Sequence, residues 1–102
     1  WGTHWWSNAA LQRFDSQGNL DFYQPHYYPW MDGSWGADHN PANLRWQDGG
    51  FDKPVVIGEF PNRGVGDTRA WLEQLDQNCY AGMWGWSHEA VDDSGSWNDI
   101  RD

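Results

Sequence analysis

The sequence KPVVIGEFP, residues 53–61, predicts a buried β-strand that ends in a carboxylate. An unbroken run of apolar or small residues is typical of strands in parallel sheets, which are covered on both faces. Because side chains alternate along a strand, Glu59 is expected to point the same way as Val55 and Ile57. The carboxyl ends of parallel strands are where α/β enzymes place catalytic groups. The simpler alternative is a Glu at a loop edge that pairs with Arg63.

The composition is that of a small acidic chain with many aromatic rings. It has 102 residues, enough for one domain with a core, and 18% of them are aromatic, including ten Trp. The mean hydropathy is nevertheless −0.94, so we expect many rings in a polar, partly open setting such as a sugar-binding cleft, and about half of the Trp in the core. A net charge of −9 disfavours nucleic-acid and anionic-membrane partners and favours a neutral ligand.

Several other kinds of site have no support in the sequence. Cys79 is the single cysteine, which excludes an intrachain disulfide and leaves the compartment open. No apolar run approaches the roughly 20 residues of a membrane span. His and Cys do not occur at metal-ligand spacings, and the acidic residues 92–99 lack the closing Glu of a calcium loop and are better explained by a turn and helix cap. We therefore expect no metal and no cofactor.

The predicted elements alternate between strands and helices. We expect strands near residues 1–6, 20–28, 54–59 and 80–86, and helices near residues 9–14 and 67–79. The long segment 29–52 is predicted as a loop with one short helix that begins at Asn40 and Pro41. Strands that are joined by helical crossovers are parallel, so their carboxyl ends gather on one side of the sheet.

Five side chains with useful chemistry follow from this arrangement. His26, Tyr28, Glu59, Trp84 and Trp86 all lie at or near carboxyl ends of predicted strands. A carboxylate, an imidazole, a phenol and two indoles are therefore expected to converge beside the longest loop. This convergence is the strongest functional signal that the residues give by themselves.

Three motifs in this order resemble a known family. HYY at residues 26–28, KPVVIGEFP at 53–61 and YAGMWGWS at 80–87 are similar to strands six, seven and eight of the clan A glycoside hydrolases. These are the (β/α)8 barrels of family five and its β-mannanase and cellulase relatives. The resemblance covers roughly residues 20–90. It implies an α/β fold, namely part of a TIM (β/α)8 barrel that covers roughly strands five to eight with the intervening helices.

The resemblance also assigns roles to individual residues. Glu59 matches the catalytic nucleophile at the end of strand seven. Tyr28 matches the Tyr that hydrogen-bonds this nucleophile, and His26 matches the His that helps to bind the sugar being cleaved. Trp86 matches the strand-eight Trp that forms the floor of that sugar subsite. The implied activity is that of a retaining, endo-acting glycosidase on a β-linked polysaccharide such as mannan or glucan.

Further aromatic and imidazole groups are candidates for substrate binding. Trp30, Trp35 and His88 follow strand ends and are candidates for the outer sugar subsites. Trp84 lies one pleat deeper than Trp86, where it either contributes to substrate binding or packs in the core. The resemblance, and nothing else in the sequence, implies a secreted or extracellular protein.

The chain also departs from the family pattern. Clan A enzymes carry their acid/base Glu in an Asn-Glu pair at the end of strand four, and no such pair occurs here. Glu73 is predicted on the solvent side of a helix, and Glu89 follows strand eight without matching the acid/base position. A complete barrel takes about 250 residues. We therefore expect residues 1–102 to be a single carboxyl-terminal segment of a barrel that carries the nucleophile without the acid/base and is inactive alone.

A partial barrel would have unpaired strand edges and an uncovered inner face. That face is expected to hold the side chains of Val55, Ile57, Phe22, Trp84 and Gly82. We therefore expect the chain to bind the remainder of its barrel or to form a homo-oligomer. The alternative functions are a non-catalytic carbohydrate-binding module, which is usually an antiparallel sandwich, and an inactive fragment that self-associates.

Overall fold

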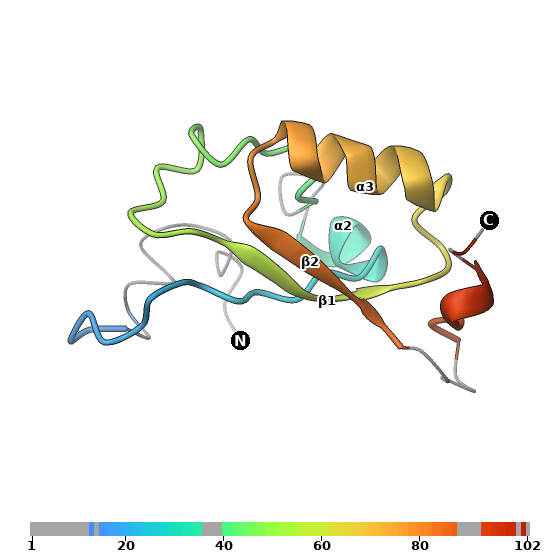
Figure 1. Ribbon diagram of the computed structural model, residues 1–102, viewed down its shortest axis with the longest axis horizontal. Coiled ribbons are helices and arrows are strands. Elements are labelled where there is room, and N and C mark those ends of the chain that lie inside the picture. The colour runs from blue at the N-terminus through green and yellow to red at the C-terminus, as the bar shows by residue number, and fades with distance from the viewer. Residues whose placement is uncertain (1–12, 14, 36–39, 88–92, 100, 102) are drawn as a thin grey trace.

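The computed structural model describes residues 13, 15–35, 40–87, 93–99 and 101. The strand that we predict near residues 1–6, nearly all of the helix near 9–14, and His88 and Glu89 lie outside these residues. The described elements are α2 (Trp30–Trp35), β1 (Val56–Pro61), α3 (Thr68–Gln77), β2 (Gly82–Trp86) and the 3-10 helix η2 (Trp97–Asp99) (Figure 1). No helix in the described ranges is long and apolar enough to cross a membrane.

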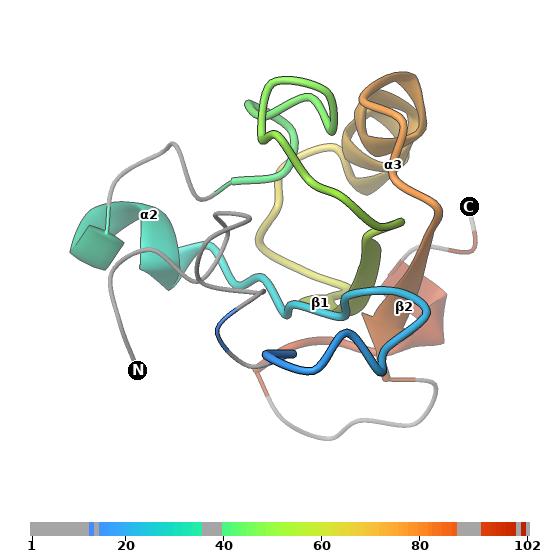
Figure 2. The same cartoon turned by 90° about the vertical axis from the view of Figure 1, so that its left-hand side faces the viewer.

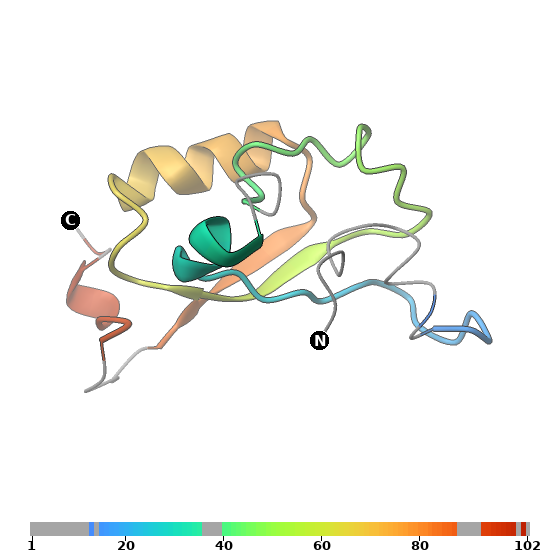
Figure 3. The same cartoon turned by 180° about the vertical axis from the view of Figure 1, so that it is seen from behind.

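The predicted strand, helix, strand order in the second half of the chain is confirmed. β1 and β2 form a two-stranded parallel sheet, and α3 connects them across one face of it (Figures 1 and 3). Asp67 caps α3 at its amino end by accepting a hydrogen bond from the backbone N–H of Ala70 at 3.0 Å. The fold is therefore a small α/β fold with a parallel sheet.

The segment near residues 20–28 runs parallel to β1, along the edge that does not pair with β2, without forming a regular strand. Two isolated parallel bridges join Tyr23 to Val55 and His26 to Glu59. Proline explains the interruption, because Pro25 has no N–H to donate, although its carbonyl accepts from Gly58 N at 2.8 Å. Figure 2 shows this segment beside β1. The predicted direction is confirmed, and the predicted regular strand is reduced to two bridges.

The short helix of the long loop lies earlier than predicted. It is α2, which begins directly after Pro29, whereas Asn40 and Pro41 lie in a bend and turns. A proline pre-sets the backbone for the first turn of a helix, and here Pro29 accepts from Asp32 N at 3.2 Å. Both Pro29 and Pro41 carry this signal, and the chain uses the first of them.

The hydrophobic core lies between the sheet and α3. Val55 and Ile57 are fully buried, and Phe60 is 2% exposed. From α3, Trp71 packs against Phe60 with ring centroids 5.2 Å apart, and Leu75 is completely buried. Burial of these apolar side chains is the main force that holds α3 on the sheet.

A bulge interrupts the regular alternation of β1. Ile57 pairs with Met83 and Phe60 pairs with Gly85, so β1 has two residues where β2 has one. The extra residue shifts the phase of the strand, and Phe60 joins Ile57 in the core. The bulge comprises Gly58 and Glu59, so it includes the predicted catalytic position.

The prediction that Glu59 shares a face with Val55 and Ile57 is therefore wrong. Those two residues are 0% exposed and face α3, whereas the Glu59 side chain meets His26 on the other side of the sheet. Phe22 and Trp84 share the face opposite α3, which agrees with the predicted common face. Val55 and Ile57, which are predicted on that same face, belong to the core instead. Simple alternation assigned them to the wrong face because it assumes a strand without a bulge.

Truncating the core side of α3 should destabilise the protein. Leu75→Ala is expected to lower the free energy of unfolding by about 2–5 kcal/mol, because it removes a completely buried side chain and leaves a cavity. Urea unfolding measures this change. Gln77→Ala, on an exposed position of the same helix, is the matched control and should stay within about 0.5 kcal/mol of the starting protein. Equal effects of the two substitutions would contradict the packing of α3 on the sheet.

Stability should fall in alkaline solution because of buried tyrosines. Burial and the hydrogen bond to Asp52 raise the pKa of Tyr23 from 10.0 to about 12, and burial also raises the pKa of Tyr27 and Tyr80. A raised folded-state pKa contributes stability that is complete below a pH of about 10 and is lost as the pH rises through about 12. Urea midpoints measured across this interval should therefore decline, and Tyr23→Phe should flatten the decline. A midpoint that does not change up to a pH of about 12 would contradict this assignment.

Candidate functional site

The candidate site is centred on a contact between Glu59 and His26. The imidazole Nδ1 lies 2.5 Å from Glu59 Oε2, with 49% of the His26 side chain and 18% of the Glu59 side chain exposed. The backbone sets this position, because the two residues form a parallel bridge and Tyr27 N donates to Glu59 O at 2.8 Å. The contact is an ion pair when the imidazole is protonated and an N–H···O hydrogen bond when it is neutral. The predicted convergence of these two side chains is confirmed.

Exposed aromatic rings lie on the same face of the sheet as this pair. Met83 packs against the core from β2, so its neighbours Trp84 and, one pleat later, Trp86 point to the opposite face. The exposed fractions are 56% for Trp84, 46% for Trp86 and 42% for Phe22. Trp84 is therefore outside the core that the described residues form, and its predicted role in substrate binding stays a prediction. We call the side of the sheet opposite α3, with these rings and the pair Glu59–His26, the open face.

The other predicted site residues have different surroundings. Tyr28 is half-buried and packs against the core, and its carbonyl accepts from Met31 N at 2.9 Å at the start of α2. Its hydrogen bond to Glu59 stays a prediction. Trp30, the first residue of α2, is 59% exposed. His88 lies outside the described residues, so its predicted role in binding also stays a prediction.

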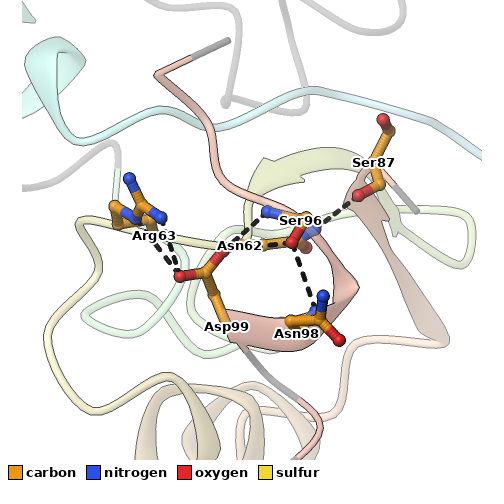
Figure 4. Close-up of polar contacts among 6 residues, drawn as sticks. All are labelled: Asn62, Arg63, Ser87, Ser96, Asn98 and Asp99. Carbon is orange, nitrogen blue, oxygen red and sulfur yellow. Dashed lines mark hydrogen bonds and ion pairs between the residues drawn. The ribbon is translucent and has the colours of Figure 1, made fainter. Parts of the chain in front are cut away.

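Asn62 holds the ends of the two strands together, a role that the sequence did not indicate. The residue is 1% exposed, and its Nδ2 donates to the carbonyl of Ser87, which follows β2, at 2.8 Å (Figure 4). A Cβ added to Gly85 would lie 2.4 Å from Asn62 Oδ1, so the close approach requires glycine there. Asn62 looked like an ordinary turn residue because its partner is 25 positions away. Through it, the strand with Glu59 and the strand with Trp86 keep a fixed spacing.

The alternative that pairs Glu59 with Arg63 is wrong. Arg63 Nη2 lies 2.9 Å from Asp99 Oδ1 (Figure 4). Arg63 N also donates to Ser94 O at 3.1 Å. Asp99 also accepts from Ser96 N at 2.7 Å. The Ser96 N–H and the Arg63 guanidinium lower the pKa of Asp99 below its usual 3.8. The acidic segment near the carboxyl terminus thus contains a capped turn that is attached to the loop after β1.

No combination of three or more His, Cys, Asp or Glu side chains in the described part of the chain could hold a metal ion. We found no match to a protein-family model, a curated protein sequence or a solved structure.

Removing the amide that joins the strand ends should weaken the fold locally. Asn62→Ala deletes the hydrogen bond to Ser87 O and leaves that carbonyl without this partner, which should cost about 1–3 kcal/mol. Urea unfolding gives the change in stability. Asn98→Ala, at an exposed position of η2, is the matched control and should cost less than about 0.5 kcal/mol. The bridging role would be refuted if Asn62→Ala were as mild as the control.

Proposed function

We propose that this chain supplies the nucleophile side of a retaining β-glycosidase of the clan A type. The observation that carries the proposal is the position of Glu59. Its carboxylate lies at the carboxyl end of the parallel strand β1, 2.5 Å from His26 Nδ1, on the face that also presents Trp84 and Trp86. The motif resemblance of HYY, KPVVIGEFP and YAGMWGWS gives independent support from the sequence.

The proposed reaction uses Glu59 as an anionic nucleophile. One carboxylate oxygen bonds to the anomeric carbon while the bond from that carbon to the leaving oxygen breaks, and water later hydrolyses the glycosyl ester. The leaving oxygen takes its proton from a second carboxyl group about 5–5.5 Å away. Glu73 does not suit that role, because it lies on an exposed face of α3 with its Oε1 3.1 Å from Arg69 Nε. We propose that the acid/base comes from another segment of the same barrel.

The open face suits a neutral β-linked glycan such as mannan or glucan. Indole faces on Trp84 and Trp86 offer apolar contact to the C–H surface of sugar rings without requiring charge on the ligand. The order of parallel segments, with residues 23–27 beside β1 and β1 beside β2, supports three adjacent strands of a (β/α)8 barrel. In that arrangement the remaining strands, or a second copy of the chain, would extend the sheet at its edges.

A second candidate function is sugar binding without catalysis. The exposed rings of Phe22, Trp84 and Trp86 favour it, because a stacking surface alone is sufficient for a binding protein. The parallel pairing of β1 with β2 counts against the antiparallel sandwich that such modules usually have. The position of Glu59 beside His26 favours the catalytic candidate.

A mechanism-based label tests the proposed nucleophile directly. The dinitrophenyl glycosides of fluorodeoxy-mannose and fluorodeoxy-glucose have leaving groups that depart without protonation, so labelling does not need the acid/base. Incubation of the protein with either compound should add one fluorosugar to Glu59, and mass spectrometry of peptides should locate it there. Glu59→Gln should abolish the label, because an amide cannot form the glycosyl ester.

The control for this experiment is Glu73→Gln, which removes an exposed carboxylate far along the chain from β1 and should leave labelling unchanged. A label on another residue, or equal labelling of Glu59→Gln, would reject the nucleophile assignment. If Glu59 stays unlabelled while the protein binds mannohexaose or cellohexaose, the non-catalytic candidate is the correct one.

A further inference from the structure

The side chain of Gln24 lies across β1 at Gly58. A Cβ added to Gly58 would be 2.2 Å from Gln24 Cγ, 2.8 Å from Cδ and 3.0 Å from Nε2. These distances are too short for any side chain at position 58 unless Gln24 moves. Gly58 therefore leaves a notch on the strand, and the Gln24 side chain fills it.

The notch is not explained by backbone conformation. Gly64 and Gly66 have positive φ angles of 93° and 81°, which favour glycine, but Gly58 does not have a positive φ. A glycine inside a strand is less stable than alanine because it loses more backbone freedom on folding. The neighbour that a larger residue at position 58 would displace is therefore the Gln24 side chain.

Gln24 is on the open face and has no evident structural task. It is exposed, while its neighbours Tyr23 and Pro25 are buried, so it shares the face of His26. Within the described part of the chain its amide makes no hydrogen bond. The amide group is therefore held against the strand by packing at Gly58, and its donors and acceptor remain available.

The bulge places Glu59 on the same face of β1 as Gly58, against which Gln24 packs. Gly58 faces Gln24 and Glu59 faces His26, so two consecutive residues of β1 point to the open face. Consecutive Cα atoms are about 3.8 Å apart. A sugar ring held against Glu59 therefore also covers the position of the Gln24 amide.

We propose that Gln24 is a sugar-binding residue of this site, and that glycine at position 58, directly before Glu59 on the open face, lets the Gln24 side chain lie against β1. The inference rests on the proposed function. An amide both donates and accepts, so it can hydrogen-bond two neighbouring hydroxyls of one ring, accepting from one and donating to the other. Because it is neutral, it adds no charge beside the carboxylate. Its ligand is thus the vicinal diol of a sugar that is bound at Glu59.

Binding measurements on a double-mutant cycle test this proposal. The proteins are the starting chain, Gln24→Ala, Gly58→Ala and the double variant, titrated calorimetrically with mannohexaose and cellohexaose. Gln24→Ala should weaken binding about 3- to 10-fold, the effect expected for one lost hydrogen-bonding group. Gly58→Ala should weaken binding similarly, because its Cβ displaces the Gln24 side chain. In the Gln24→Ala background it should have little further effect, since the group that it displaces is already gone.

Three comparisons keep the result interpretable. Gln24→Met retains the length of the side chain without the amide and should bind as weakly as Gln24→Ala, which separates hydrogen bonding from packing. Gln77→Ala on α3 should bind like the starting chain. Thermal midpoints of the Gln24 variants should be unchanged, because the side chain is exposed and makes no hydrogen bond to the described residues.

Three outcomes would overturn the proposal. Binding by Gln24→Ala within about twofold of the starting chain would show that the amide does not touch the sugar. An equal loss on Gly58→Ala in both backgrounds would show that position 58 does not act through Gln24. Trp84→Ala distinguishes sugar binding by the open face from the specific role of Gln24. If Trp84→Ala abolishes binding while Gln24→Ala does not, the open face binds sugar without a contribution from Gln24. Failure of the starting chain to bind either hexaose would reject both sugar binding by the open face and the role of Gln24.

Discussion

Glu59 reaches solvent because β1 contains one more residue than β2 between their paired positions. Without that residue, alternation would place the carboxylate in line with Val55 and Ile57, which are completely buried beneath α3. A carboxylate in that apolar layer would lose its hydration without an opposite charge, at a cost of several kcal/mol. The bulge avoids this cost and lets Phe60 fill the layer instead. The division between the core and the candidate site therefore depends on the local irregularity of one strand.

Packing in the core positions β1 and the segment beside it, and these in turn position Glu59 and His26. Trp71 of α3 contacts both Phe60 and Tyr27, with ring centroids 5.2 and 5.5 Å apart. These contacts join β1 to the segment that carries His26. Tyr27 is the residue after His26, and the Tyr27 N–H donates to Glu59 O. Aromatic packing on the opposite side of the sheet thus supports the backbone bridge that places the imidazole beside the carboxylate. A rigid layer of this kind is what a preorganised site needs.

Much of this arrangement was predictable, and the remainder depends on contacts between distant residues. Helical spacing located α3, the apolar runs located β1 and β2, and crossover connections implied the parallel pairing that brings His26 to Glu59. The bulge was not predictable, because VIGEF alternates acceptably by itself and the mismatch exists only relative to β2. Asn62 was missed for the same reason, since its partner Ser87 follows the other strand. In the long loop, two prolines carried the same signal for a helix start, and local sequence could not rank them.

The charge around Glu59 on the open face depends on where the basic side chains form their ion pairs. Arg63 is paired with Asp99, Lys53 with Asp15, and Arg69 with Glu73, so each of these three basic side chains is neutralised by an acidic partner away from Glu59. Glu59 instead contacts an imidazole, whose charge depends on its protonation. A permanent guanidinium at that distance would hold the carboxylate in a strong charged pair and reduce its ability to attack carbon. A neutral imidazole can orient the same carboxylate through one hydrogen bond and leave its negative charge available, which suits a nucleophile better than the Arg63 pairing would.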